Sequence, residues 1–353
     1  MKWENSISKI LGVRYPIVQA PMFGVTTPQM VAAAAQADAL GSLPLADLPA
    51  DQCIATIRAT KALTPKPFAV NIFVNAIPPL SAELRTQYTQ TKQYVAQLAE
   101  LHGLEVELPN IDQIKLTDYH DQVDAIIAEG CKIVSFIFGN LDAQSIQKLK
   151  AHGTVLIGTC TSVNEAIQLE QAGIDLICVQ GIEAGGHRGS FEDHDIPQIG
   201  GLSLLAQVCE QVKTPLIYAG GIYNAKTLHA AKVLGAQGFQ IGSLLLGAKE
   251  SALQEFEKQR LRQANESDVM LTKSFSGRYA RGLRNAFIQA MENSGMVLPY
   301  PYQNKLTGEL RKVARQHRNT DFVNIWAGQS IHDYPSKSTT EMIQQLITEA
   351  ENF

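Results

Sequence analysis

The chain has 353 residues, of which 45% are hydrophobic, and a formal net charge of −4 at pH 7. Its Lys and Arg residues are scattered, so the sequence offers no basic track for nucleic acid or for an anionic membrane surface. It contains no apolar run of about 18 residues that would span a bilayer, and its first residues lack the apolar core of a signal peptide. We therefore expect a cytoplasmic protein whose partners are small molecules.

The five cysteines are an odd number, lie far apart in the chain and in three cases fall inside apolar runs. Such cysteines are typical of buried thiols in a reducing compartment and not of disulfides or zinc ligands. The sequence therefore predicts no metal site. The five are Cys53, Cys131, Cys160, Cys178 and Cys209.

Eight short runs are apolar and rich in β-branched residues, as strands buried on both faces are. Helical patterns follow most of them, with N-caps expected at Thr27, at Thr161 or Ser162, and at Asn224, and helix ends expected at Gly173 and Gly235. Alternation of eight strands with helices predicts an α/β fold, a (β/α)8 TIM barrel. The runs are residues 16–20, 41–46, 68–73, 132–138, 154–159, 176–181, 215–221 and 238–243.

Two segments are additional to the strands and helices of a TIM barrel. The stretch between the third and fourth strands, 74–131, is far longer than a normal connection and carries a helical pattern, and about a hundred residues follow the eighth strand. We predict a barrel of residues 1–75 and 115–247. A mostly helical cap of residues 76–114 and 248–353 would cover its mouth, with the C-terminal end free to pack back on the barrel.

Glycines follow the seventh and eighth strands in the segment 219–243. In TIM barrels these two loops often bind phosphate, because glycine lets backbone N–H groups approach the anion and a helix N-terminus favours it. We therefore predict a cofactor that carries a phosphate, in preference to simple tight turns. Met22, just after the first strand, offers a soft apolar face to a planar ligand or else fills the core.

Three amides lie at the ends of predicted strands: Asn71, Gln180 and Gln240. A buried amide needs hydrogen-bond partners, so each either pins backbone or reads the heteroatoms of a ligand ring. Three amides from different strands favour a polar ring system.

His187 lies in the glycine-rich stretch "QGIEAGGHRGSFE", residues 180–192, directly after the sixth strand. A histidine there can exchange a proton with a substrate that the glycines let approach, although most single loop histidines have no such role. With an ordinary pKa it would make activity on a protonated substrate rise with pH near neutrality. Glu183 and Arg188 are expected to pair with each other or with surface charges. The other seven histidines are interpreted as surface residues.

Arg278, Arg281 and Arg284 follow one another at a spacing of three, which places them along one face if the segment is helical. They form an ion-pairing stripe or contact substrate. The segment from Tyr300 to Lys305 either lines a pocket for a small anion or packs the cap against the barrel.

The chain resembles the nitronate monooxygenases, formerly grouped as 2-nitropropane dioxygenases, which are FMN-dependent barrel enzymes. The motifs that carry the resemblance extend over nearly the whole chain, from "YPIVQAPMFG" through "FAVNIFV", "GTCTSVNEA", "QGIEAGGHRGSF" and "LGAQGFQIGS" to "SGRYARGLRN" and "YPYQNKLT". The resemblance implies that His187 is the catalytic base. It implies FMN contacts at Met22, Asn71, Gln180, Gly185, Gly220, Gly221, Gln240, Ile241, Gly242 and Ser243.

The same resemblance implies oxidation of alkyl nitronates, of the propionate 3-nitronate type, by O2 to a carbonyl compound and nitrite without NAD(P)H. Two alternatives stay open: a related FMN-dependent enoyl-acyl-carrier-protein reductase, and a non-catalytic flavin-binding barrel. The oligomeric state is also open, a homodimer being one choice. The chain departs from the family pattern at "DALG", residues 38–41, and at Pro44, which argues against close ligand approach at the second strand.

Overall fold

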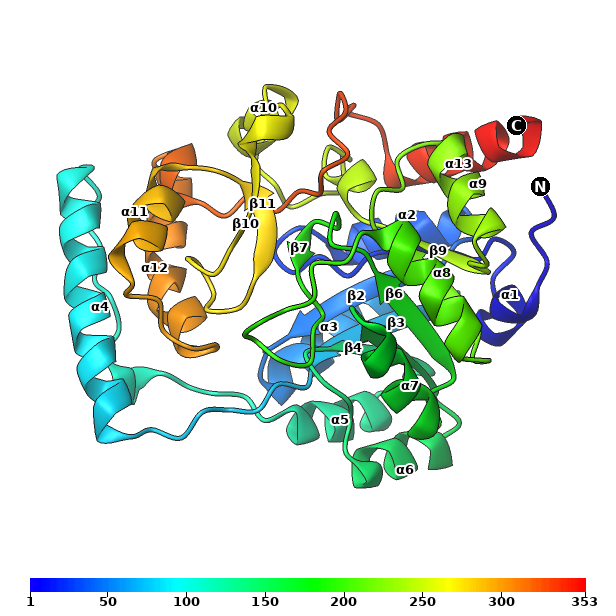
Figure 1. The fold of residues 1–353 in the computed structure, drawn as a ribbon, viewed down its shortest axis with the longest axis horizontal. Helices are drawn as coiled ribbons and strands as arrows, with labels where there is room; N and C mark the ends of the chain where they lie inside the picture. The colour runs from blue at the N-terminus through cyan, green and yellow to red at the C-terminus, as the bar shows by residue number, and fades with distance from the viewer.

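The computed structural model describes residues 1–353. Its main sheet has eight parallel strands in the order β1-β9-β8-β6-β5-β4-β3-β2, and a bridge between Val18 and Leu40 joins the two edges. The predicted (β/α)8 barrel is confirmed (Figure 1). The strands are β1 (Ile17–Gln19), β2 (Gly41–Ala46), β3 (Phe68–Phe73), β4 (Ile133–Ile137), β5 (Val155–Cys160), β6 (Leu176–Gln180), β8 (Leu216–Ala219) and β9 (Gly238–Ile241).

Helices surround the barrel, and several begin where the sequence predicts. Thr27, Ser162 and Asn224 accept hydrogen bonds as N-caps, and Gly173 and Gly235 follow helix ends with φ of +77° and +111°. The outer helices are α2 (Pro28–Gln36), α3 (Ala50–Lys61), α5 (Tyr119–Ala128), α6 (Ala143–Ala151), α7 (Val163–Gln171), α8 (Gly201–Gln211) and α9 (Ala225–Val233).

The apolar core of the barrel has two layers. A cluster of 48 buried residues fills the space between strands and outer helices, and a cluster of 11 lies inside the barrel. The inner cluster contains Ile7 and Leu11 of α1 (Ser6–Leu11), so this short helix closes the amino end of the barrel. The open end is therefore the carboxyl end, where enzymes of this architecture place their loops.

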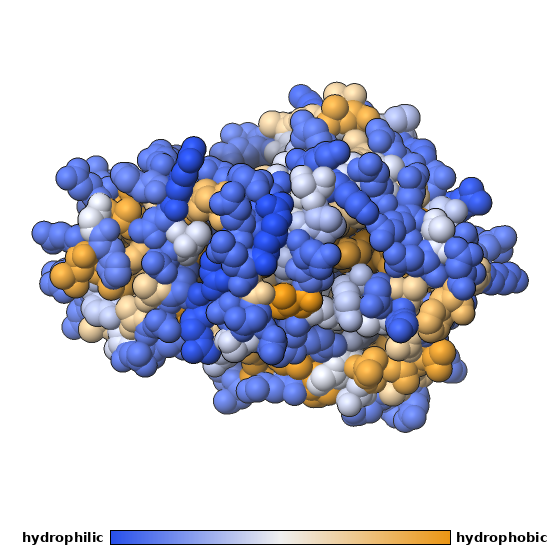
Figure 2. Space-filling view, turned by 90° about the horizontal axis from the view of Figure 1, so that it is seen from above, coloured by the Kyte–Doolittle hydropathy of each residue, from blue (hydrophilic) through white to orange (hydrophobic).

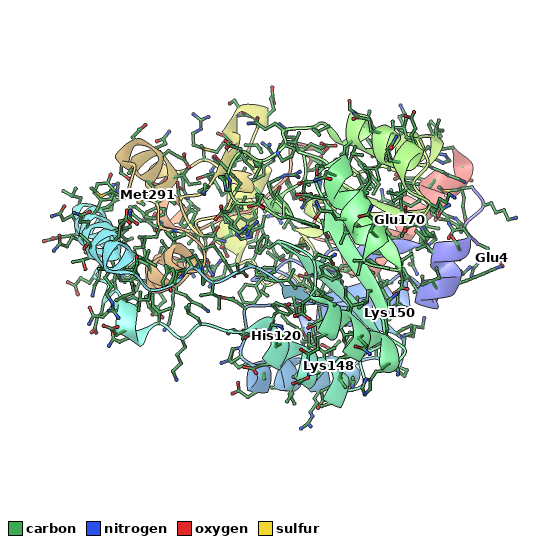
Figure 3. The ribbon with its side chains drawn as sticks, turned by 60° about the horizontal axis from the view of Figure 1, so that its bottom comes forward. Glu4, His120, Lys148, Lys150, Glu170 and Met291 are labelled. Atoms are coloured by element: carbon green, nitrogen blue, oxygen red, sulfur yellow. The ribbon has the colours of Figure 1, made fainter.

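The elements of residues 76–114, in the long insertion after β3, and most of those between β9 and α13 form a second layer on the left of Figure 1. This layer has a separate core cluster of 26 buried residues. Figure 3 shows Met291 of this layer well away from Lys148 and Glu170 on the barrel helices. The division into barrel and cap stays our proposal. The elements are α4 (Ala82–Leu101), α10 (Glu255–Arg262), α11 (Ala286–Ser294), α12 (Tyr302–Gln316) and the short helices η1 (Ile111–Gln113), η3 (Glu266–Asp268) and η4 (Thr320–Phe322).

The sequence did not predict a small antiparallel sheet in this layer. Its order is β10 (Val269–Thr272), β11 (Ala280–Leu283) and β7 (Gly186–His187). The prediction that Arg278, Arg281 and Arg284 share a helical face is wrong, because Arg281 lies in β11 and the others flank it. Strand β11 links the predicted histidine loop to the second layer, since Ala280 of β11 pairs with His187 of β7.

The last helix, α13 (Thr339–Asn352), lies against the barrel helices. Five of its apolar residues belong to the 48-residue core cluster, and Thr340 donates a hydrogen bond of 2.7 Å to the carbonyl oxygen of Ala33 on α2. Near the other end of α13, His229 on α9 contacts the carbonyl oxygen of Ala350 at 2.8 Å.

The surface seen in Figure 2 is mostly hydrophilic, with apolar residues in scattered groups. None of the helices combines the length and apolar character that a membrane span requires.

We predict that Gly41→Ala destabilises the fold. A Cβ at Gly41 would lie 2.5 Å from the backbone oxygen of Val31, where α2 packs against β2. Such overpacking costs about 1–3 kcal/mol of unfolding free energy, to be measured by urea denaturation. Gly200→Ala is the matched control, since its Cβ would meet nothing within 4 Å. Equal stability of the two variants would contradict this packing.

Candidate active site

A cavity of about 240 Å³ lies at the carboxyl ends of the strands and is lined by 34 residues, 14 of them hydrophobic. All eight barrel strands contribute residues at or just after their carboxyl ends. The second layer supplies the roof, made of Tyr300, Asn304, Arg311, Arg315, Asn324, Trp326, Gly328 and Ser330. The cavity is therefore shared by barrel and roof.

Nine of the ten residues expected to contact a cofactor line this cavity, and so does His187. The exception is Ile241, which is 1% exposed and belongs to the core between strands and helices. Successive side chains of a strand face opposite sides, so Gln240 faces the cavity and Ile241 does not. The roles of the nine residues in binding stay predictions.

Backbone N–H groups gather at the ends of β8 and β9. Those of Gly220, Gly221, Gly242 and Ser243 donate no hydrogen bond within the chain. Gly220 and Gly221 have φ of +127° and +67°, which side chains other than glycine rarely tolerate. These unpartnered donors form a cradle suited to an anion. The N-terminus of α9 is not part of it, since Asn224 and Thr227 already cap that end.

The three predicted amides differ in their hydrogen-bond partners, and any contact of theirs with a ligand stays a prediction. Gln180 pins backbone: it donates to the carbonyl oxygen of His187 at 3.0 Å and accepts from the N–H of Gly189 at 2.8 Å. Asn71 is 3% exposed and donates to the hydroxyl of Ser135 at 2.9 Å. Gln240 makes no side-chain hydrogen bond in the chain, so its amide is available to a ligand.

Gly185 is required by the roof, a role its sequence context did not reveal. A Cβ at Gly185 would lie 2.5 Å from the backbone nitrogen of Gly328 and 2.9 Å from the hydroxyl of Ser243. That hydroxyl accepts a hydrogen bond of 2.8 Å from the N–H of Gly328. The absent side chain therefore lets the segment around Gly328 close over the cavity.

His187 borders the cavity inside an aromatic enclosure. Its ring centroid lies 5.6 Å from those of Phe138 and Trp326, and Nε2 lies 2.8 Å from the hydroxyl oxygen of Ser276. Burial, and then the charges of Arg278 and Arg311, lower the pKa of His187 to about 3. The expectation of an ordinary pKa is wrong, because both effects disfavour the charged ring.

Three arginines around the histidine loop are almost fully buried, and none forms an ion pair. Arg188, Arg278 and Arg281 are 2%, 6% and 6% exposed. The expected pairing of Arg188 with Glu183 is wrong, because Arg188 donates to the carbonyl oxygens of Gln180 and Gly181. The carboxylate of Glu183 instead accepts from the hydroxyl of Tyr218 at 2.5 Å.

The other two buried arginines hold the same loop from the roof side. Arg281 donates to the carbonyl oxygen of Ile182 at 2.9 Å. Arg278 donates to three successive carbonyl oxygens of residues 190–192 and lies over the ring of Phe138 at 4.2 Å. Arg284, in contrast, is exposed. Two of the three arginines singled out in the sequence therefore position the loop.

The segment from Tyr300 to Lys305 both lines the cavity and fastens the roof. The hydroxyl of Tyr300 is buried without a hydrogen-bond partner, and Lys305 forms an ion pair of 2.6 Å with Asp47, after β2. Arg311 also lines the cavity, and its Nη1 atom has no partner in the chain. Tyr300 and Arg311 thus offer free donors to an anion.

Several lining residues escaped the sequence analysis, mainly Trp326, Asn324 and Gly328. They come from the short stretch "NIWAGQS", residues 324–330, whose mixture of Trp, Gly and amides was the available signal. Asp47 was also missed. The unusual "DALG" segment lies before β2, at the amino end of that strand, and none of its residues lines the cavity.

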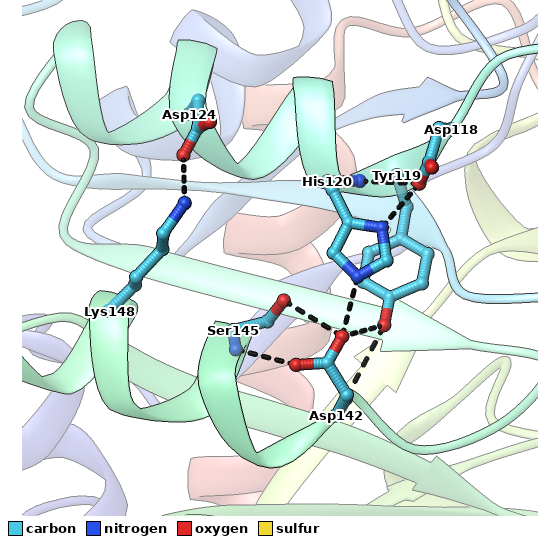
Figure 4. Close-up of polar contacts among 7 residues, drawn as sticks. All are labelled: Asp118, Tyr119, His120, Asp124, Asp142, Ser145 and Lys148. Atoms are coloured by element: carbon cyan, nitrogen blue, oxygen red, sulfur yellow. Dashed lines mark hydrogen bonds and ion pairs between the residues drawn. The ribbon is translucent and has the colours of Figure 1, made fainter.

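A second histidine with a shifted pKa lies outside the site. His120 contacts Asp142 and Asp118, the N-cap residues of α6 and α5 (Figure 4), and these hydrogen bonds raise its pKa. Tyr119 donates to the same Asp142 at 2.6 Å, and Lys148 pairs with Asp124 at 2.8 Å. This network fastens α5 to α6, in keeping with the surface interpretation of His120.

Comparisons with known proteins identify the family. The family model described as nitronate monooxygenase matches residues 4–349. A probable nitronate monooxygenase of Staphylococcus saprophyticus is 35% identical, with 99% of this chain and 98% of the relative covered. One from Staphylococcus aureus is also 35% identical, over 98% of this chain and 96% of the relative.

Comparison with solved structures supports the same family. A nitroalkane oxidase from Streptomyces ansochromogenes superposes with a TM-score of 0.88 and 31% identity, covering 99% of this chain and 98% of that one. A mutant of FabK from Thermotoga maritima gives a TM-score of 0.75 and 25% identity, covering 99% and 97%. With a family match over nearly its whole length, this chain belongs to the nitronate monooxygenases, a family of flavin-dependent oxidoreductases.

Proposed function

We propose that the protein uses FMN and O2 to oxidise alkyl nitronates, of the propionate 3-nitronate type, to a carbonyl compound and nitrite without NAD(P)H. The observation that carries this proposal is the charge around the cavity. Arg311 lines the cavity and its Nη1 atom has no partner in the chain. Burial first, and then the charges of Arg278 and Arg311, lower the pKa of His187 to about 3. Such a site favours an anion, and a nitronate is one.

Three features of the cavity support FMN as the cofactor. The free N–H groups after β8 and β9 suit a terminal phosphate, and the unpartnered amide of Gln240 faces the same cavity. Met22 supplies a soft apolar contact from the end of β1. Bound FMN would supply the redox chemistry between nitronate and oxygen. The protein supplies position, charge and a roof that limits access of water.

His187 serves the neutral form of the substrate in this proposal. A nitroalkane must lose an α-proton before it becomes a nitronate, and His187 is uncharged at neutral pH and able to accept that proton. Its low pKa makes it a weak base. We therefore expect preformed nitronate to be the better substrate.

The first prediction from this proposed function concerns the cofactor. Mass spectrometry of released cofactor should show one FMN per chain, and Gln240→Leu should weaken FMN binding roughly 2- to 10-fold, the effect of one hydrogen bond of about 0.5–1.5 kcal/mol. Gln237→Leu, at an exposed position before the same strand, is the control. Release of FAD, or equal affinity in both variants, would contradict the assignment.

The second prediction concerns the reaction. An oxygen electrode should record uptake on addition of nitronate alone, with nitrite formed and no change when NADH is added, because a nitronate already carries the electrons that the flavin accepts. Rapid NADH consumption with an enoyl thioester would instead support the reductase. A flavin-loaded protein that turns over neither substrate would support the non-catalytic barrel.

The third prediction separates the two substrate forms. His187→Asn should lower turnover of freshly dissolved neutral nitroalkane by about 10²-fold or more, since the base is lost, and should affect nitronate much less. Because the pKa is lowered to about 3, the ring is deprotonated throughout pH 5–8 and adds no rise in activity there. Stopped assays across that range measure both effects.

His194→Asn is the control for this substitution, because His194 is exposed and contacts only Asp193. Equal losses on nitroalkane and nitronate would show that His187 binds substrate without acting as a base. A rise in wild-type activity that centres near pH 6.5 and disappears in His187→Asn would contradict the lowered pKa.

A further inference from the structure

We propose that Ser276 is a positioning residue that holds His187 as the tautomer with hydrogen on Nε2, so that Nδ1 presents its lone pair to the cavity. The chemical consequence rests on the function proposed above, whereas the tautomer itself can be observed without any substrate. The sequence analysis assigned no role to this serine, although it begins the motif "SGRYARGLRN", 89 positions after the histidine.

The hydroxyl of Ser276 contacts three polar atoms. Ser276 is 1% exposed, and its Oγ lies 2.8 Å from Nε2 of His187, 3.0 Å from the carbonyl oxygen of Arg278 and 3.3 Å from the backbone nitrogen of Arg278. The turn between Ser276 and β11 holds this arrangement, and β11 pairs with β7, which carries the histidine.

Counting hydrogens decides the direction of each contact. The hydroxyl has one hydrogen, and the carbonyl oxygen of Arg278 has no other donor in the chain. If Ser276 donates to that carbonyl, its oxygen accepts from the N–H of Arg278 and from Nε2–H of His187, and all three contacts are satisfied. If it donated to Nε2, the carbonyl would lose its only donor, which is costly in a buried site.

The other ring nitrogen is left for the substrate. Nδ1 of His187 has no hydrogen-bond partner in the chain, yet it is not one of the buried polar atoms without a partner, so it is accessible. Because His187 lines the cavity, we infer that Nδ1 is accessible from there. The tautomer is therefore fixed by the hydrogen bond at the far side of the ring, as is usual for functional histidines.

This tautomer determines what His187 can do. The α C–H bond of a neutral nitroalkane breaks, its proton goes to Nδ1, and the electron pair stays on the substrate as the nitronate. A lone pair at Nδ1 repels the nitronate oxygens, which leaves them to the free donors of Tyr300 and Arg311. His187 then acts on the α-carbon and does not hold the anion.

The tautomer is tested directly by NMR on protein labelled with 15N histidine, at neutral pH and with the cofactor bound. The His187 signals are identified by their loss in His187→Asn. We expect wild type to show hydrogen on Nε2 only. Ser276→Ala should show both tautomers, and Ser276→Thr, which keeps the hydroxyl, should restore the wild-type pattern.

The kinetic arm uses the same variants. Ser276→Ala should lower kcat for neutral nitroalkane by about 10-fold, part of the 10²–10⁴ that general base catalysis supplies. It should leave kcat/KM for nitronate within about 2-fold. Ser274→Ala is the matched control, since Ser274 is equally buried, lies two residues away and contacts Thr272 and Glu292 but not His187.

Each outcome decides the proposal. A wild-type signal with hydrogen on Nδ1, or a tautomer unchanged in Ser276→Ala, overturns it. So does a loss in Ser276→Ala that is equal on both substrates or is matched by Ser274→Ala. If wild type oxidises neither substrate, the proposed function fails and the NMR result alone decides the tautomer.

Discussion

The site depends on buried guanidinium groups that bind backbone carbonyls and have no carboxylate partner. Arg188, Arg278 and Arg281 together hold the carbonyl oxygens of residues 180–182 and 190–192, on both sides of His187. Charged hydrogen bonds of this kind are strong, and an uncompensated buried charge is costly. The guanidinium groups that order this loop therefore also place positive charge beside the cavity.

That charge links structure to chemistry. Burial is the main cause of the lowered pKa of His187, and the charges of Arg278 and Arg311 add to it. Those charges, unlike burial, also favour an anion in the cavity, such as the proposed nitronate. The cradle of free N–H groups after β8 and β9 adds a second place for negative charge, suited to a phosphate. In the proposed function, the arginine charges would favour the substrate anion and the free N–H groups would bind the phosphate of the cofactor.

The barrel was predictable from the sequence because its strands are buried on both faces and read as continuous apolar runs. Residues at strand ends were also predictable, since TIM barrels place their chemistry there. Ile241 was misplaced because strand alternation turns it into the core, one residue from Gln240.

The roof was harder to foresee. The spacing of Arg278, Arg281 and Arg284 suits a helix, yet the segment pairs as a strand with the two residues of β7, too short to leave a pattern. The partners of Gly185 and His187 lie at Gly328 and Ser276, about 140 and 89 positions away. Contacts between such distant segments leave no local signal, and only the folded structure shows them.

In the proposed function, electrons reach the flavin from a nitronate anion and not from a nicotinamide. The most direct test is to mix flavin-loaded protein with nitronate in the absence of oxygen and NADH while following the absorbance of oxidised flavin. We expect this absorbance to fall when nitronate alone is added. Flavin that stays oxidised with nitronate and is reduced only after NADH is added would contradict it.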